Sequence, residues 1–97
     1  MMADLRKAAC GLMCTIRIPG YCTHNPEKSM LAHYRMAGTC GTATKPHDMQ
    51  AAIACSVCHD LIDGRVKTDD YAKEELRLMH AEGVFRTQEI WREKGLI

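Results

Sequence analysis

The segment that most restricts the fold of this chain runs from Cys55 to Asp60 and reads CSVCHD. Two cysteines three positions apart can bind one metal ion through both thiolates. If the residues after Cys58 are helical, His59 and Asp63 lie four positions apart on one helix face. Thiolates suit zinc held for structure, whereas an imidazole with a carboxylate suits a harder, exchangeable ion. This segment therefore predicts ligands for two kinds of metal ion.

A second pair of cysteines, Cys14 and Cys22, lies earlier in the chain, with a Pro-Gly turn between its members. A chain of 97 residues buries limited apolar surface, and bound zinc would give it an additional cross-link. We expect one closed tetrahedral zinc site, with the ligands Cys14, Cys22, Cys55 and Cys58. The alternative is that Cys14 and Cys22 are simply small buried residues that bind no metal. Among the six cysteines, Cys40 is the better replacement ligand and Cys10 is expected to be a free thiol.

The cysteines also bear on the cellular compartment. The sequence shows no apolar run of signal-peptide length and no segment long enough to cross a bilayer. We therefore expect a cytoplasmic protein with no membrane partner, in which thiolates are favoured over disulfides. The string Cys-x-x-Cys-His is also the attachment signature of c-type haem, but attachment requires export and would leave four cysteines without a role. We expect no haem, and the flanking pattern does not fit a thioredoxin-like redox site.

Charge and aromatic content say little about partners. The formal net charge is +1, which argues against a strongly cationic surface overall but does not exclude a local cluster. The five aromatic residues argue against a base-stacking platform of the kind that binds single strands. Nucleic acid is neither indicated nor excluded by composition.

Hydrophobic periodicity predicts short strands followed by helices. Alternation at 14–18 and 29–35 predicts two strands, and the apolar run 49–54 predicts a strand that enters a turn at Cys55. Helices are expected at 3–9 and at 56–63, the latter ended by Gly64. The segment between the second strand and Asp48 is a long loop rich in Gly and Thr, and long loops in small domains are often functional.

The C-terminal part is predicted to form two further helices. Asp69 and Asp70 would open the first, which runs to about residue 82 and is capped by Gly83. Thr87 is expected to cap the second, which bears Ile90 and Trp91 and is ended by a glycine.

His33 is the candidate general base, at the end of the second predicted strand. An imidazole can take a proton from water near neutral pH, and such catalysis is typically worth ~10²–10⁴-fold. A lone histidine is more often structural, but His59 and Asp63 could hold Mg²⁺ or a similar divalent ion that polarises a phosphoryl oxygen. Arg35 shares a strand face with His33 and could clamp a phosphate, although a solvated arginine is an equal alternative. The remaining histidines are expected at the surface: His24, His47 and His80.

These segments resemble the small prophage-encoded nucleases of the YbcO type, and the resemblance covers nearly the whole chain. It rests on residues 2–9, 14–22, 31–33 and 53–60. The resemblance implies an HNH-like ββα-metal module, in which a hairpin ends in the base histidine and a helix presents metal ligands. It assigns His33 as the base, His59 as the histidine after the second cysteine pair, and Asp63 as a ligand one helical turn further on.

The chain departs from the HNH pattern at two positions. Ala32 precedes the base, where HNH proteins often carry a metal-binding Asp or His, and Gln50 falls near the central Asn. We predict a single α+β domain over residues 1–97, with a zinc-braced ββα-metal core and additional C-terminal helices. Its predicted function is metal-dependent hydrolysis of phosphodiester bonds in DNA. The alternative is an inactive, zinc-stabilised nucleic-acid-binding or adaptor protein.

Overall fold

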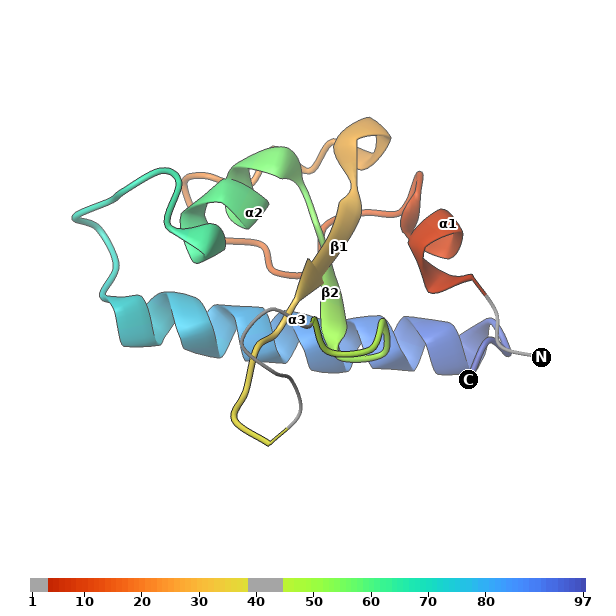
Figure 1. The fold of residues 1–97 in the computed structure, drawn as a ribbon. Helices are drawn as coiled ribbons and strands as arrows, with labels where there is room; N and C mark the ends of the chain where they lie inside the picture. Colours follow the sequence, from red (N-terminus) through yellow and green to blue (C-terminus); the bar gives the residue numbers. More distant parts are fainter. Residues whose placement is uncertain (1–3, 39–44) are drawn as a thin grey trace.

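The computed structural model describes residues 4–38 and 45–97, and its architecture is α+β, as predicted. Figure 1 shows a small two-stranded sheet that crosses one long helix, with a shorter helix on either side of the strands. In chain order the elements are α1 (Leu5–Ala9), the 3₁₀ helix η1 (Pro26–Lys28), β1 (Met30–His33), β2 (Ala51–Ala54), α2 (Ser56–Asp63) and α3 (Lys73–Glu93).

The sheet is antiparallel and short. Met30 pairs with Ala54 at one end, and His33 pairs with Ala51 at the other. The prediction of strands within 29–35 and 49–54 is thus confirmed over residues 30–33 and 51–54. The chain between β1 and β2 contains Cys40, which lies outside the described residues. The register places the last residue of β1 beside the first residue of β2, so both ends of the connecting loop meet at His33.

The helix α2 begins and ends where the sequence predicts. The Cys55 side chain accepts a hydrogen bond from the Cys58 backbone at its N-terminus. At its C-terminus Gly64 adopts φ +78°, the left-handed conformation that glycine takes without a steric penalty. Cys58 and Leu61 form its buried face. Since β2 leads directly into this helix, the order of elements is strand, strand, helix.

The predicted strand at 14–18 was wrong. Cys14, Ile16 and Ile18 are buried as alternation predicts, but Arg17 has φ +55°, which interrupts an extended strand. Thr15 is also buried, where the alternating pattern would expose it. The segment is held by backbone and side-chain hydrogen bonds from Thr15 to the carbonyl of Ile53, at 2.8 and 3.0 Å. It therefore lies as an irregular segment beside β2.

The two predicted C-terminal helices are one continuous helix, α3. Its first turn carries Glu74 and Glu75 rather than the predicted aspartates, and the Glu75 carboxylate accepts a hydrogen bond from the Ala72 backbone at 2.8 Å. Gly83 is not a cap but a crossing point, because a Cβ there would lie 2.9 Å from Ile16 Cγ1 and 3.2 Å from Ala52 Cβ. Glycine and the alanines of β2 allow helix and strand to approach closely.

Thr87 does not cap a helix either, since it lies buried in the middle of α3. Its hydroxyl accepts a hydrogen bond from the Ile53 backbone N–H at 3.0 Å and lies 2.9 Å from the hydroxyl of Thr15. Thr87 is thus explained by the edge of β2 that does not pair with β1, because the buried backbone N–H of Ile53 on that edge needs a hydrogen-bond acceptor.

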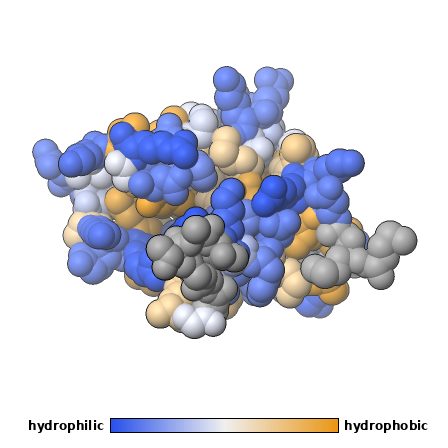
Figure 2. Space-filling model, in the orientation of Figure 1, coloured by the Kyte–Doolittle hydropathy of each residue, from blue (hydrophilic) through white to orange (hydrophobic). Residues whose placement is uncertain are grey.

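α3 joins two clusters of buried side chains. The first surrounds the cysteines of α2 and includes Val84, and the second packs Trp91 against Leu5, Ala9 and Ile53. On the face seen in Figure 2, hydrophilic side chains cover most of the surface and apolar atoms emerge in small areas. Over the described ranges 4–38 and 45–97, no helix combines the length and apolar character needed to cross a membrane.

Candidate functional site

Four cysteines form the first part of the site. The sulfur atoms of Cys14, Cys22, Cys55 and Cys58 all lie within 4.8 Å of one another. Three of the four side chains are buried, and Cys22 is half-buried. A tetrahedral zinc ion with Zn–S bonds of about 2.3 Å requires S···S separations of roughly 3.8 Å. The separation of 3.9 Å between the sulfurs of Cys22 and Cys55 matches that requirement.

The cluster contains no disulfide, because all four of its cysteines are free thiols. A hydrogen bond from Cys58 lowers the pKa of the Cys14 thiol to about 4 and raises that of Cys58. Burial raises the pKa of Cys22 to about 11. Four packed thiols cannot all ionise beside one another unless a cation joins them. The donor set therefore fits a thiolate-preferring divalent ion such as zinc, and the four residues could hold one.

Two segments far apart in the chain meet at this cluster. A turn after Ile18 positions Cys22, whose backbone N–H donates to the Ile18 carbonyl at 2.9 Å. Cys55 and Cys58 come from the end of β2 and the first turn of α2. A metal ion held here would tie the irregular 14–22 segment to α2.

The second part of the site is a cavity of about 390 Å³, which we call the histidine cavity. Its walls come from β1, from α2 and from the loops next to them: Leu31, His33, Arg35, Lys45, His59, Asp63 and Arg65. The four residues singled out from the sequence as base, metal ligands and phosphate clamp are thus brought to one cavity. Lys45 and Arg65 add two cations that the sequence analysis did not identify.

Asp48 is a further residue that sequence reasoning missed. Its Oδ1 lies 2.8 Å from Nε2 of His33, and the guanidinium of Arg6 lies 3.5 Å away. The hydrogen bond from His33, followed by the charge of Arg6, holds the pKa of Asp48 below its usual range. The ionised carboxylate can only accept, so His33 donates from Nε2 and, when neutral, carries its basic lone pair on Nδ1. Asp48 lies in a loop without periodicity, so no pattern in the sequence pointed to it.

His59 and Asp63 lie one helical turn apart on α2. Nε2 of His59 lies 3.5 Å from Oδ2 of Asp63, and the guanidinium of Arg65 lies 3.7 Å from the same oxygen. His59 directly follows Cys58, yet it lines the histidine cavity while Cys58 points into the cysteine cluster. One helix thus contributes side chains to both parts of the site.

The remaining predicted residues are placed as follows. Gln50 donates from its side chain to the Tyr34 carbonyl at 2.7 Å, which fixes the chain just after β1. Cys10 is an exposed free thiol, and His24 and His47 are exposed, all as predicted. His80 was wrongly predicted at the surface. It is buried in α3 with Nε2 2.8 Å from the Ala32 carbonyl, and burial lowers its pKa.

Periodicity could have indicated that His80 is buried. It lies four positions after Leu76 and next to Met79, within the apolar stripe that was expected on this helix.

Known proteins are similar to this chain in sequence and in fold. The family model described as "Putative nuclease YbcO" matches residues 3–96. A protein of Escherichia coli K12 named "Putative nuclease YbcO" is 57% identical over 98 residues, covering 99% of this chain and 98% of its own length. A protein of the same name from Enterobacteria phage 82 matches with the same identity and coverage.

One solved structure is also similar. A chain described as a "putative bacteriophage protein" from Escherichia coli K-12 MG1655 superposes with a TM-score of 0.77 at 46% sequence identity. The match covers 95% of this chain and 100% of that chain. A family model that spans nearly every residue, together with relatives of the same length, establishes the assignment: the chain belongs to the YbcO family of nuclease-like phage and prophage proteins.

Proposed function

We propose that this protein is a metal-dependent DNA endonuclease of prophage type, built on an HNH-like ββα-metal core. The observation that carries the proposal is the histidine cavity, where His33 from β1 and His59 with Asp63 from α2 line one space. The order β1, β2, α2, with a histidine at the end of the first strand and ligands on the helix, supports the HNH-like assignment.

His33 acts as the general base. Asp48 holds the imidazole through Nε2, which keeps the ring oriented and leaves Nδ1 to accept a proton from the attacking water. The hydrogen bond from His33, together with the charge of Arg6, holds the pKa of Asp48 below its usual range, so the carboxylate is ionised at neutral pH. The His33 side chain is only 9% exposed, whereas that of Asp48 is 33% exposed, so the imidazole is largely shielded and the carboxylate is half-buried.

His59 and Asp63 would hold the catalytic divalent ion. Two protein ligands leave positions for water and a substrate phosphate, as is usual for Mg²⁺. When bound, such an ion supplies Lewis-acid polarisation of a phosphoryl oxygen and stabilises charge on the leaving oxygen. Arg35, Lys45 and Arg65 line the same cavity and bind the phosphate by charge-assisted hydrogen bonds.

The cysteine cluster serves as a brace in this proposal. Structural zinc bound by its four thiolates would fix α2 relative to the segment before β1, and so fix His59 and Asp63 relative to His33. In this role zinc contributes folding energy rather than chemistry.

The test compares nicking of supercoiled plasmid DNA by the zinc-loaded protein with added Mg²⁺ or Mn²⁺. His33→Ala should reduce the rate about 10²–10⁴-fold, the range typical of a general base. His47→Ala removes an exposed histidine outside the cavity and is the matched control, expected to keep the wild-type rate. Equal nicking by wild type and His33→Ala would remove His33 from the mechanism.

A specific observation favours a second function, that of a nucleic-acid-binding adaptor without catalysis. Ala32, at the position before the base, is buried in β1 and offers no metal ligand. An adaptor would bind plasmid DNA equally with and without Mg²⁺ and would show no nicking at any metal concentration.

A further inference from the structure

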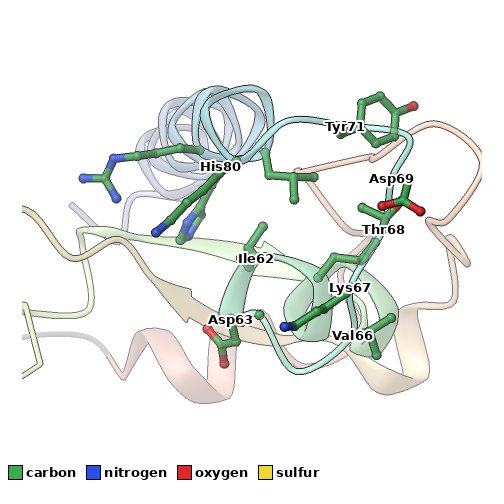
Figure 3. A pocket seen from close by; sticks show the side chains of 13 residues that line it. Ile62, Asp63, Val66, Lys67, Thr68, Asp69, Tyr71 and His80 are labelled. Carbon is green, nitrogen blue, oxygen red and sulfur yellow. The ribbon is translucent and has the colours of Figure 1, made fainter.

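A second cavity adjoins the histidine cavity. It has a volume of about 530 Å³ and lies between the end of α2, the loop 64–72 and the first turns of α3, as Figure 3 shows. Asp63 lines both cavities, so they meet at this residue. We call the second one the loop cavity. Its volume lies within the range of sites that enclose a small organic molecule or a single nucleotide.

The loop cavity is lined by both aliphatic and basic side chains. Ile62 and Leu76 contribute aliphatic surface from two different helices. Lys67, Lys73 and Arg77 line the cavity as well. Aliphatic surface and cations in one cavity suit a ligand that combines a flat, weakly polar ring with a phosphate.

Charge across the two cavities is strongly uneven. Together they are lined by six of the thirteen Lys and Arg residues of the chain but by only two of its twelve carboxylates, Asp63 and Asp69. The chain as a whole has a formal charge of only +1. The excess of cations therefore gathers where a phosphate chain could pass from one cavity to the next.

The loop that forms the outer wall is anchored. The hydroxyl of Tyr21 lies 2.6 Å from that of Thr68 and also bonds Asp70, and the hydroxyl of Tyr71 donates to the Pro19 carbonyl at 2.8 Å. These contacts tie the loop to the turn between Cys14 and Cys22. The cavity is thus part of the fixed framework that also carries the cysteine cluster.

We propose that the loop cavity receives the base of an unpaired nucleotide next to the phosphate that is cleaved, so that the preferred substrate is single-stranded or locally unpaired DNA. The inference rests on the proposed nuclease function for the position of that phosphate. A strand that places one phosphate in the histidine cavity continues past Asp63, where the next base meets Ile62 and Leu76 and the next phosphate meets Lys67 or Lys73. A base stacked within a duplex cannot enter such a cavity without leaving the helix.

The experiment measures binding of fluorescent oligonucleotides by anisotropy, using the full zinc-loaded chain at low salt without Mg²⁺ or Mn²⁺. The probes are oligothymidylate, the same strand annealed to its complement, and an abasic strand of equal length with the same phosphates. We expect the duplex and the abasic strand each to bind about fivefold or more weakly than oligothymidylate, which is the lower end of the loss seen when one base–aromatic stacking contact is removed. Equal affinity for oligothymidylate and the abasic strand would overturn the proposal, and so would equal affinity for the duplex.

Two pairs of variants locate the binding. Lys67→Glu should weaken binding of oligothymidylate, whereas Lys28→Glu, an equal charge change on exposed η1, should not. Leu76→Glu should abolish the difference between oligothymidylate and the abasic strand, whereas Leu78→Glu, on the exposed side of the same helix, should preserve it. If Leu76→Glu does not fold, the comparison of Lys67→Glu with Lys28→Glu and the abasic probe still test the proposal. Equal behaviour within the Lys67 and Lys28 pair would place the bound strand elsewhere.

The two proposals fail separately. Binding is measured without a catalytic ion, so loss of the base contact says nothing about His33. Conversely, plasmid nicking that depends on His33 would stand even if all three oligonucleotide probes bound equally.

Discussion

Replacing Thr87 by valine tests how the edge of β2 is held. The Thr15 hydroxyl donates to the Ile53 carbonyl, so its single hydrogen is used and Thr87 must be the donor in the Thr15–Thr87 hydrogen bond. Thr87 in turn accepts from the Ile53 N–H. The two hydroxyls therefore close a ring that satisfies both backbone groups of Ile53. This residue lies midway between Ala51, the partner of His33, and Cys55 of the cysteine cluster.

The expected magnitude follows from what each variant leaves unpaired. Thr87→Val keeps the volume but removes the acceptor of a buried N–H, which costs about 1–3 kcal/mol. Thr87→Ser keeps the hydroxyl and loses one methyl group, worth about 1 kcal/mol. We expect valine to lower the free energy of unfolding by about 2–3 kcal/mol and serine by about 1 kcal/mol. At 4–8 °C per kcal/mol for a chain of this size, valine should lower Tm by roughly 10–20 °C.

The assay is thermal and urea unfolding followed by far-UV circular dichroism, at one fixed concentration of free zinc because bound metal stabilises the folded state. Thr15→Val should cost less than Thr87→Val, since the Ile53 carbonyl keeps the backbone N–H of Thr15 as a donor. The effects of the two substitutions should not add, because both hydroxyls belong to one ring. A Thr87→Val protein as stable as wild type, or more stable than Thr87→Ser, would refute the reasoning.

Three further predictions concern the close contact of α3 with β2 at Gly83, the cysteine cluster, and the loss of stability at acid pH. Gly83→Ala should destabilise the protein by up to about 2 kcal/mol in thermal unfolding, because overpacking against Ile16 outweighs a helix-propensity gain of about 1 kcal/mol; a stabilised variant would contradict the close crossing. Cys58→Ser should abolish zinc in metal analysis of the purified protein and Cys10→Ser should not, so retained zinc in Cys58→Ser would exclude the cluster as its site. Folding lowers the pKa of Asp48, so this residue stabilises the folded state above the pKa of an unfolded Asp, about 3.9, and that stabilisation is lost as pH falls through the lower folded value. Asp48→Asn should therefore lose less stability than wild type between those two pH values. If the free energy of unfolding of the variant falls with pH as steeply as that of wild type, the pairing with His33 is refuted.

The elements that could be predicted from sequence are those specified by neighbouring residues. Gly64 ends α2 through its own backbone conformation, and the spacing of Cys55 and Cys58 places two thiols at the start of the same helix. Local pattern also identified β2, because a short apolar run led directly into the second cysteine pair. In these cases the signal and the structure lie within a few residues of each other.

The errors occurred where a residue is explained by a distant partner. Gly83 and Thr87 have the chemistry of helix ends, and only their contacts with Ile16 and Ile53 reveal why they lie inside a helix. The role of Asp48 likewise depends on the antiparallel register, which brings its loop back to His33. Sequence patterns report local conformation well, whereas pairings across the fold require the tertiary structure.

The position of α3 in chain order has a consequence for how the molecule is made. Every cysteine of the cluster and both strands precede α3, so they leave the ribosome before the helix that covers them. Until Val84 and Trp91 have been synthesised, Ile53 and the alanines of β2 have no helix against which to pack. If the four thiols bind a metal ion, they are available to do so before α3 is complete, whereas burial of the strands must await release of the final helix. The order of synthesis thus makes all four thiols available before the core can close.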